Sequence, residues 1–170
     1  MKKDSRIFIA GESTIEGKAL LRLIKARNYK NIINLDNGAT TWKRSATIGN
    51  VPTSGNSMMF DNYSFDDRPN TDEVHLPKID FLNATTAQLT FDVAYARYNS
   101  GYSDGLEVLI SIDCGTTFTS LYSKSGSTLA TANDIQSSYT PSTSEWRNDT
   151  VNLDAYIGSN NVMLVFRNLA

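Results

Sequence analysis

The stretch Gln-Leu-Thr-Phe-Asp-Val-Ala-Tyr-Ala-Arg-Tyr at residues 88–98 decides the fold. Its apolar residues alternate with polar or small ones, and this places Leu89, Phe91, Val93 and Tyr95 on one face. A period of two is typical of a β-strand that buries one side. We therefore expect a β-strand here with these four residues on one face.

Further strands are expected downstream, separated by turns rich in Gly, Asn and Ser. The predicted strands are Leu106–Asp113, Phe118–Lys124, Thr150–Asp154 and Asn161–Arg167. Short alternating strands between such turns indicate a mainly β protein, an antiparallel sandwich. Residues 130–146 are polar and irregular, and we expect them to cross between the two sheets.

Several of these motifs resemble one group of protein modules. The motifs are Leu89–Tyr98, Ser103–Val108, Ser111–Thr117 and Tyr122–Gly126. The chain over residues 37–170 is similar to jelly-roll modules of Bacteroidetes surface and secreted proteins, of the choice-of-anchor J, MAM-like and cleaved-adhesin types. The resemblance implies a jelly-roll sandwich and a non-enzymatic, adhesin-like module that binds a glycan or protein ligand. It also implies a secreted or cell-surface location.

The chain departs from that group after Arg167 and Asn168, where the group usually continues with a closing strand. We therefore expect residues 37–170 to form a jelly roll that lacks its last strand. An unpaired sheet edge favours aggregation. As an alternative, a strand from residues 6–10 or 31–36 could fill the gap.

The first 36 residues follow a different pattern. A short apolar run, Arg6–Ala10, precedes Gly11, and apolar residues then recur at helical spacing between Thr14 and Arg27. Residues 31–36 indicate a second strand that ends in Asp36. Strand, glycine turn, helix, strand and terminal acid is the order of a Rossmann-like β-α-β segment. We expect residues 1–36 to form such a segment ahead of the sandwich.

This segment resembles the N-terminus of GDP-L-fucose synthases and related short-chain epimerase/reductases. The resemblance makes Gly11, Gly17 and Asp36 candidate cofactor-binding residues, but Thr14 stands at the middle glycine position. A Cβ there crowds the approach of a pyrophosphate. The chain also has no Tyr-x-x-x-Lys pair. We expect a structural remnant that does not bind NADP. The alternative is a fragment of an NADP-dependent nucleotide-sugar epimerase/reductase without an intact active site.

Charge and composition exclude several classes of function. Residues 1–36 hold eight Lys or Arg against four Asp or Glu, and residues 37–170 hold eight against fourteen. An acidic sandwich does not fit a nucleic-acid surface. No apolar run approaches the roughly 20 residues of a membrane helix, so no membrane insertion is expected. The residues after Met1 form too short an apolar region for a signal peptide. The single cysteine, Cys114, is expected to be buried and inert.

Acidic residues in loops are candidate metal ligands. Ca²⁺ takes six to eight oxygen ligands, and loop carboxylates supply them. The candidates are Asp61, Asp66, Asp67 and Asp72, together with Asn62, and Asp104 in a separate turn. Related jelly rolls hold structural calcium, so the resemblance points the same way. The alternative is that these acids make the loops soluble and cap turns.

Aromatic side chains are the remaining candidates for ligand contact. Tyr98 and Tyr102 flank a Gly-Ser loop and are predicted to bind ligand. Other tyrosines taken as exposed are Tyr95, Tyr122 and Tyr139, whereas Trp42 and Trp146 are expected to fill the core. No catalytic residue is predicted. His75 is the only histidine, so a zinc site built on several histidines is not expected.

Overall fold

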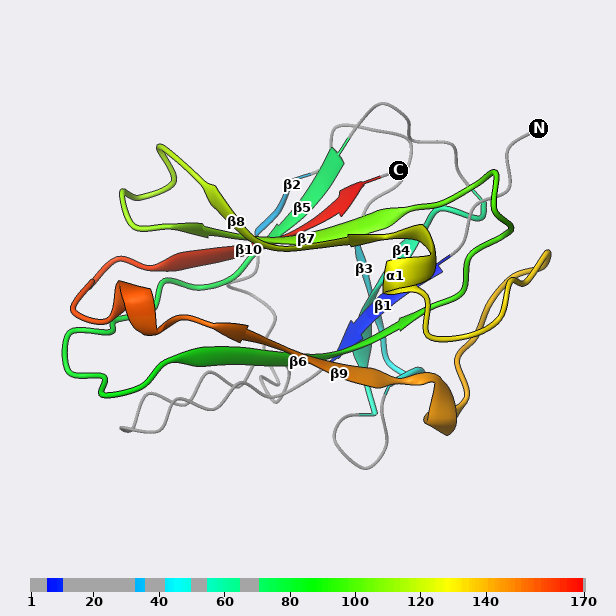
Figure 1. Cartoon of the computed structure of the whole chain (residues 1–170), viewed down its shortest axis with the longest axis horizontal. Helices are drawn as coiled ribbons and strands as arrows, with labels where there is room; N and C mark the ends of the chain where they lie inside the picture. Colours follow the sequence, from blue (N-terminus) through cyan, green and yellow to red (C-terminus); the bar gives the residue numbers. More distant parts are fainter. Residues whose placement is uncertain (1–5, 11–32, 36–41, 50–54, 65–70, 170) are drawn as a thin grey trace.

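The protein is a sandwich of two antiparallel β-sheets (Figure 1). The computed structural model describes residues 6–10, 33–35, 42–49, 55–64 and 71–169. One sheet has the strand order β3 (Lys43–Ser45), β4 (Ser57–Asp61), β1 (Arg6–Ala10), β6 (Gln88–Tyr95) and β9 (Arg147–Asn152). The other has the order β2 (Ile33–Leu35), β5 (Thr71–His75), β10 (Met163–Leu169), β7 (Gly105–Ser111) and β8 (Thr119–Ser125). The prediction of an antiparallel, mainly β protein is therefore confirmed.

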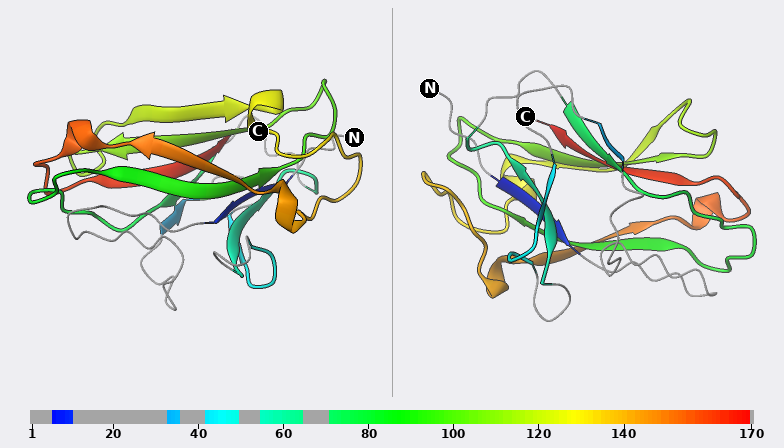
Figure 2. Two further views of the ribbon diagram at one scale, coloured as in Figure 1. Left: turned by 60° about the horizontal axis from the view of Figure 1, so that its bottom comes forward. Right: turned by 180° about the vertical axis from the view of Figure 1, so that it is seen from behind.

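The strands pair in a nested order along the chain. β7 pairs with β8, β6 with β9, and β5 with β10, all antiparallel. Each pair encloses the previous one in sequence, as in a long hairpin ribbon that is wrapped around the core. The two layers are visible from three directions in Figures 1 and 2.

The alternation predicted for residues 88–98 is confirmed in β6. Leu89, Phe91, Val93 and Tyr95 are at most 1% exposed and belong to the central core between the sheets. Phe91 makes an edge-to-face contact with Phe166 of β10, with ring centroids 5.1 Å apart. Such packing adds to the hydrophobic stabilisation that comes from area burial alone.

A second, smaller apolar cluster is built on the even-numbered residues at the end of β6. Ala94 and Ala96 are fully buried and pack with Tyr139, while Trp146 contributes partly buried surface. Successive side chains of a strand point to opposite faces, so this cluster lies on the outer side of the sheet. The segment that contains Tyr139 and Trp146 therefore covers the end of β6.

Residues 130–146 connect β8 to β9 and so cross from one sheet to the other, as predicted. The connection begins after a single helical turn, α1 (Gly126–Leu129), and ends in a 3-10 turn, η2 (Thr143–Glu145). Another 3-10 turn, η3 (Asp154–Tyr156), follows β9. In the described part of the chain, no helix is long and apolar enough to span a membrane.

The prediction of a parallel β-α-β unit over residues 1–36 was wrong in its strand pairing. Both predicted strands form, but β1 joins one sheet and β2 joins the other. β1 pairs antiparallel with β4 and β6, and β2 pairs antiparallel with β5. In a β-α-β unit the two strands are parallel and the helix crosses between them. The helix predicted over residues 14–27 lies outside the described residues.

Candidate ligand-binding cleft

Two connections meet at one end of the sandwich: residues 96–104, between β6 and β7, and residues 126–146, between β8 and β9. Figure 2 shows them at the same end in both views. Backbone hydrogen bonds join them, because Thr131 N donates to Tyr95 O at 2.8 Å and Ile135 N donates to Arg97 O at 2.9 Å. The pairing of β9 with β6 ends at Arg147, which lies opposite Val93. Beyond that point, the β8–β9 connection forms the hydrogen bonds to residues 95–97 in place of β9.

A paired charge fixes the two connections to each other. Arg97 Nε and Nη2 donate to Asp134 Oδ1 and Oδ2 at 2.9 and 3.0 Å. A bidentate guanidinium–carboxylate pair is the geometrically most specific kind of ion pair. Both side chains stay partly exposed, at 23% and 40%, so the pair orients the connections and remains within reach of a ligand.

The β8–β9 connection, with Arg97 from the other connection, lines a shallow, open cleft of about 650 Å³. Its polar lining carries one guanidinium, two carboxylates, one amide and two hydroxyls: Arg97, Asp134, Glu145, Asn133, Ser127 and Thr131. Both carboxylates have partners, because Glu145 Oε2 accepts from Ser142 N at 2.7 Å and Asp134 is held by Arg97. The lining therefore presents oriented donors and acceptors with a small excess of negative charge.

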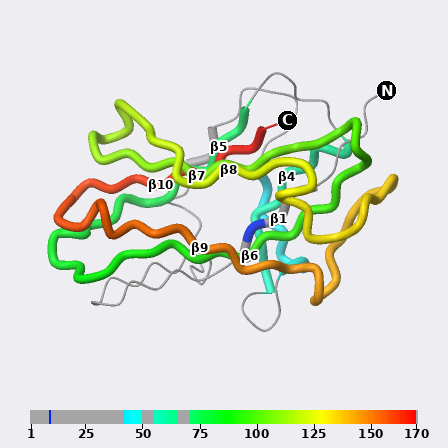
Figure 3. Tube along the Cα trace, viewed as in Figure 1, coloured from blue at the N-terminus to red at the C-terminus, as the bar shows by residue number. Residues whose placement is uncertain are grey.

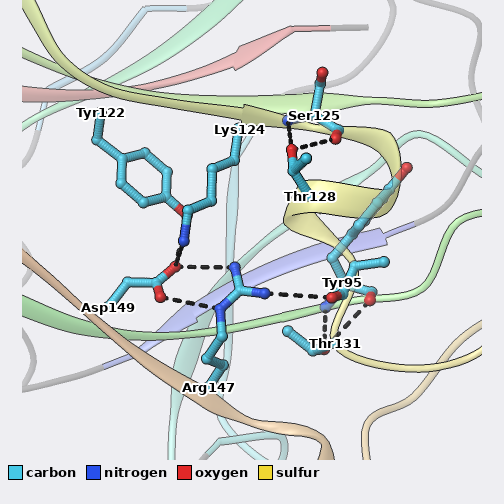
Figure 4. Close-up of polar contacts among 9 residues, drawn as sticks. Tyr95, Tyr122, Lys124, Ser125, Thr128, Thr131, Arg147 and Asp149 are labelled. Atoms are coloured by element: carbon cyan, nitrogen blue, oxygen red, sulfur yellow. Dashed lines mark hydrogen bonds and ion pairs between the residues drawn. The ribbon is translucent and has the colours of Figure 1, made fainter.

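A cluster around Asp149 supports the side of the cleft (Figure 4). Tyr122 Oη and Lys124 Nζ, from β8, donate to Asp149 Oδ2 at 2.7 and 3.1 Å. Arg147 Nε and Nη2 donate to the two oxygens of Asp149 at 2.9 Å each. β8 and β9 are edge strands of different sheets, so this cluster joins the two sheets along one side of the sandwich.

Arg147 also reaches the wall of the cleft. Its Nη1 donates to the backbone oxygen of Ala130, a residue of the cleft, at 3.3 Å. Thr131, the next residue, accepts a hydrogen bond at Oγ1 from Tyr95 N at 3.0 Å. The wall is therefore anchored to β6 on one side and to the Asp149 cluster on the other.

Titration of the cluster follows from these contacts. Burial raises the pKa of Tyr122, and the hydrogen bond that it donates to Asp149 raises it further. Burial alone would raise the pKa of Asp149, but hydrogen bonds from Arg147, Tyr122 and Lys124 outweigh it and lower the pKa. The cluster therefore holds a neutral phenol against a carboxylate that is charged at neutral pH.

Tyr98 and Tyr102, the predicted ligand contacts, are brought together. Their rings meet edge to face, with centroids 5.8 Å apart, and both side chains are half-buried. The turn between them is closed by Tyr102 N, which donates to Asn99 O at 3.2 Å, and by Gly101 N, which donates to Asn99 Oδ1 at 2.8 Å. Tyr98 directly follows Arg97 of the cleft, so the aromatic pair and the cleft share one connection.

The other tyrosines taken as exposed are buried, which corrects that expectation. Tyr95 is fully buried, and its Oη donates to Asp104 Oδ2 at 3.2 Å. Tyr122 and Tyr139 are at most 9% exposed. Trp42 fills the core as predicted, at 2% exposed, whereas Trp146 is only partly buried. A hydrogen-bond partner for the hydroxyl is what lets Tyr95 and Tyr122 enter the core.

The acids predicted to bind calcium are only partly described by the structure. Within the residues that the structure describes, no group of three or more His, Cys, Asp or Glu side chains could hold a metal ion. Asp61 accepts from Ser64 N and Oγ at 3.1 and 3.0 Å, which caps a turn. Asp104 N donates to Tyr95 Oη at 2.9 Å, and Tyr95 Oη donates to Asp104 Oδ2 at 3.2 Å. Asp72 is buried in β5. Asp66 and Asp67 lie outside the described residues, so the calcium prediction is untested there.

The candidate cofactor residues Gly11, Gly17 and Asp36 also lie outside the described residues. The strands on either side of the expected phosphate turn, β1 and β2, are in different sheets. A dinucleotide site needs the two strands to be parallel in one sheet, with the turn at their carboxyl edge. The arrangement therefore does not provide that frame for NADP.

His75 belongs to a charged network on the outer face of the other sheet. Its Nε2 lies 2.6 Å from Glu73 Oε2, and Arg167 Nε donates to Glu73 Oε1 at 2.7 Å. Burial raises the pKa of Glu73, but hydrogen bonds from His75 and Arg167 outweigh this and lower it. Arg167 lies directly opposite Glu73 in the strand register, and cross-strand ion pairs of this kind stabilise a sheet.

Cys114 is exposed, which corrects the expectation of a buried thiol. It lies in the turn between β7 and β8 with a φ of 62°, and Gly115 follows with a φ of 85°. The turn is held by Asp113, whose carboxylate accepts from Thr117 N and Oγ1 at 2.9 and 2.6 Å. Two consecutive left-handed residues are typical of a tight turn, and the Cys114 side chain is exposed there.

A scan against protein-family models and searches of curated proteins and solved structures found no match to this chain.

Proposed function

We propose that the sandwich is a jelly roll and that it acts as a non-catalytic carbohydrate-binding module of a secreted or cell-surface protein. The nested pairs β7–β8, β6–β9 and β5–β10 support the jelly-roll assignment, because this fold is a hairpin ribbon wrapped into two sheets. β4 pairs with β1, which precedes it in the chain, so this pair widens the sheet but does not enclose the others in sequence.

The observation that carries the proposal is the polar cleft, together with the Tyr98–Tyr102 pair on the same connection as Arg97. A sugar presents hydroxyls that both donate and accept hydrogen bonds, together with an apolar ring face. The cleft supplies donors from Arg97 and Asn133 and acceptors from Asp134 and Glu145. Tyrosine rings supply apolar area with a polar rim. Loops at one end of a rigid sandwich are also where binding residues concentrate.

Charge favours a neutral ligand over a phosphate. The lining has two carboxylates and one guanidinium, and that guanidinium is already paired with Asp134. A phosphate would meet uncompensated negative charge, whereas a neutral polyol meets hydrogen-bonding groups.

A binding role also accounts for the state of the two carboxylates. Glycoside hydrolysis needs one carboxyl group as a proton donor and a second as base or nucleophile. Asp134 is held in a bidentate pair with Arg97, and Glu145 caps the backbone of Ser142. Both carboxylates are therefore already engaged by donors of this chain, and this arrangement suits a binding wall better than a pair of proton-transfer groups.

Calcium is not part of this proposal, because Asp61 caps a turn and Asp104 accepts from Tyr95. The module is proposed to bind through its own side chains. Chelation by EDTA is therefore expected to leave glycan binding unchanged.

Binding to a panel of neutral mono- and oligosaccharides tests the proposal. We expect the wild-type chain to bind at least one class, and Tyr98→Ala, Tyr102→Ala and Asn133→Ala each to weaken binding about tenfold or more, which corresponds to about 1.4 kcal/mol. Leu82→Ala is the control, because Leu82 is 52% exposed and lies in the β5–β6 connection. Release of reducing sugar by the wild-type chain would contradict the non-catalytic assignment, and binding that survives all three substitutions would contradict the site.

A further inference from the structure

β1 occupies an internal place in its sheet. Ile7 lies opposite Phe60 of β4 on one side and opposite Tyr95 of β6 on the other. Among the described strands, β4 and β6 are joined within this sheet only through β1. We call the space between β4 and β6 the β1 slot.

An empty β1 slot would be costly. The facing edges of β4 and β6 each carry a row of backbone N–H and C=O groups that β1 now pairs. Buried backbone groups without partners are rare in folded proteins because each costs free energy comparable to a lost hydrogen bond. Ile9 adds apolar area to the central core and is only 4% exposed. The β1 slot therefore demands an extended strand with an apolar residue at that position.

The chain reaches the β1 slot by an unusual route. In the nested pairs, β7 and β8 are consecutive strands, and β6–β9 and β5–β10 enclose them in turn. A pair that enclosed β5–β10 would join β4 to a strand after β10, but β4 instead pairs with β1, which comes before it and is separated from it by residues 11–56. No tight hairpin joins β1 to β4 or to β6, the two strands that it pairs with. No short turn therefore holds β1 in its place in the sheet.

We propose that the β1 slot is a strand-acceptor site that also takes the β1 segment of a second copy of this chain. Residues 11–32, between β1 and β2, can span at most roughly 70 Å when extended. A compact chain of this length has a radius of gyration of about 15 Å, so β1 can reach a neighbouring molecule. Because β1 is covalently linked to the rest of its own chain, its effective concentration at the β1 slot is of the order of millimolar. Exchange therefore competes only in concentrated protein, and it yields strand-swapped dimers.

A pair of single-cysteine chains tests exchange directly. In a Cys114→Ser background, one chain carries Phe8→Cys and the other Met59→Cys; these two positions are Cα partners in the β1–β4 register. The 8–59 disulfide cannot form within either chain. The two chains are unfolded, mixed, refolded together at about 0.5 mM, comparable to the effective concentration, and then oxidised. Phe8→Cys mixed with Leu82→Cys is the control, because Leu82 is exposed and outside the sheet.

We expect the 8–59 heterodimer to exceed the 8–82 product several-fold and to increase with protein concentration. Equal yields of the two products would overturn exchange. A single chain that carries both Phe8→Cys and Met59→Cys checks the premise, because it should close an intrachain disulfide after refolding in dilute solution. Failure of that closure in a folded chain would overturn the placement of β1 itself.

A peptide provides a second measurement that does not depend on refolding mixtures. The full chain with Ile9→Asp, which weakens its own β1, is titrated with a labelled peptide of residues 4–12. We expect the peptide to bind and to raise the melting temperature of this variant, and a peptide with Ile9→Asp to bind at least tenfold more weakly. Equal binding of the two peptides, or no binding to the folded variant, would overturn the acceptor site.

Discussion

Tyr122 of β8 donates a 2.7 Å hydrogen bond to the Oδ2 atom of Asp149 on β9, and this contact joins the edges of the two sheets. The ring of Tyr122 meanwhile packs edge to face on Phe91 in the core, with centroids 5.3 Å apart. The Tyr122 side chain therefore packs in the core through its ring and links the two sheets through its hydroxyl.

Tyr122→Phe keeps the ring and removes the hydroxyl. We expect a loss of about 1.5–3 kcal/mol in the free energy of unfolding, because the lost hydrogen bond has a charged acceptor. Tyr98→Phe is the matched control and should cost less than about 0.5 kcal/mol, because Tyr98 is only half-buried. Urea denaturation followed by tryptophan fluorescence measures both. Equal stability of the two variants would contradict the role of the Tyr122–Asp149 contact.

Asn62 and Asn168 form a second link between the sheets. Their side-chain amides exchange hydrogen bonds of 3.1 and 3.3 Å, and both residues are at most 2% exposed. Asn168→Ala should cost about 1–3 kcal/mol, because it leaves the amide of Asn62 buried without this partner. The Asn62→Ala/Asn168→Ala double variant should cost less than the sum of the single variants.

Calorimetric unfolding of the four chains measures this coupling. Asn160→Ala, at an exposed position, is the control and should change the stability by less than about 0.5 kcal/mol. Strictly additive losses at Asn62 and Asn168 would show that the two amides do not depend on each other.

Asp113 gives a prediction for pH dependence. Hydrogen bonds from the Thr117 side chain, the Thr117 backbone and Ser111 lower its pKa to about 2. A carboxyl group whose pKa is lower in the folded state stabilises the fold above its unfolded pKa, which is near 3.8. That stabilisation is lost as the pH falls from about 4 to about 2.

Thr117→Val removes the first of these donors. We expect the pKa of Asp113 to rise towards its ordinary value, as followed by NMR of the side-chain carboxyl carbon. Thr116→Val is the control, because the Thr116 hydroxyl donates to the backbone oxygen of Asp113 and not to the carboxylate. Titration of Asp113 near 3.8 in the wild-type chain would contradict the turn geometry.

The strands of the sandwich could be predicted from sequence because their signal is local. Alternation in residues 88–95 directly gives the core face of β6, and Leu89, Phe91 and Val93 are buried as expected. The turn that places Tyr98 beside Tyr102 is also local. Both features depend only on residues within a few positions of one another.

The role of the N-terminal strands could not be predicted in the same way. Residues 6–10 form a strand whether their neighbours are parallel or antiparallel, and the local sequence does not choose between them. The choice is made by distant partners, since Ile7 pairs with Phe60 and Tyr95. An apolar strand followed by Gly11 is also the local pattern of a nucleotide-binding unit. That unit does not form here, because β1 and β2 lie in different sheets.

The cleft and the buried tyrosines escaped prediction for a related reason. Arg97 and Asp134 are 37 residues apart, and nothing in the polar stretch 130–146 marks one acid as a partner. Tyr95 and Tyr122 are hydrophobic in body and polar at the tip, so their burial depends on acceptors that the fold supplies from Asp104 and Asp149.

The most direct test of the account is a map of the ligand contact by NMR. Backbone amide shifts of ¹⁵N-labelled chain are recorded while a bound oligosaccharide from the panel is titrated. The account predicts that the largest shift changes fall on Arg97, Gly101 and Asn133, and that Leu82 and Gly158 stay unchanged. Shift changes centred on Leu82 or Gly158, or spread evenly over both sheets, would contradict a binding site in the cleft.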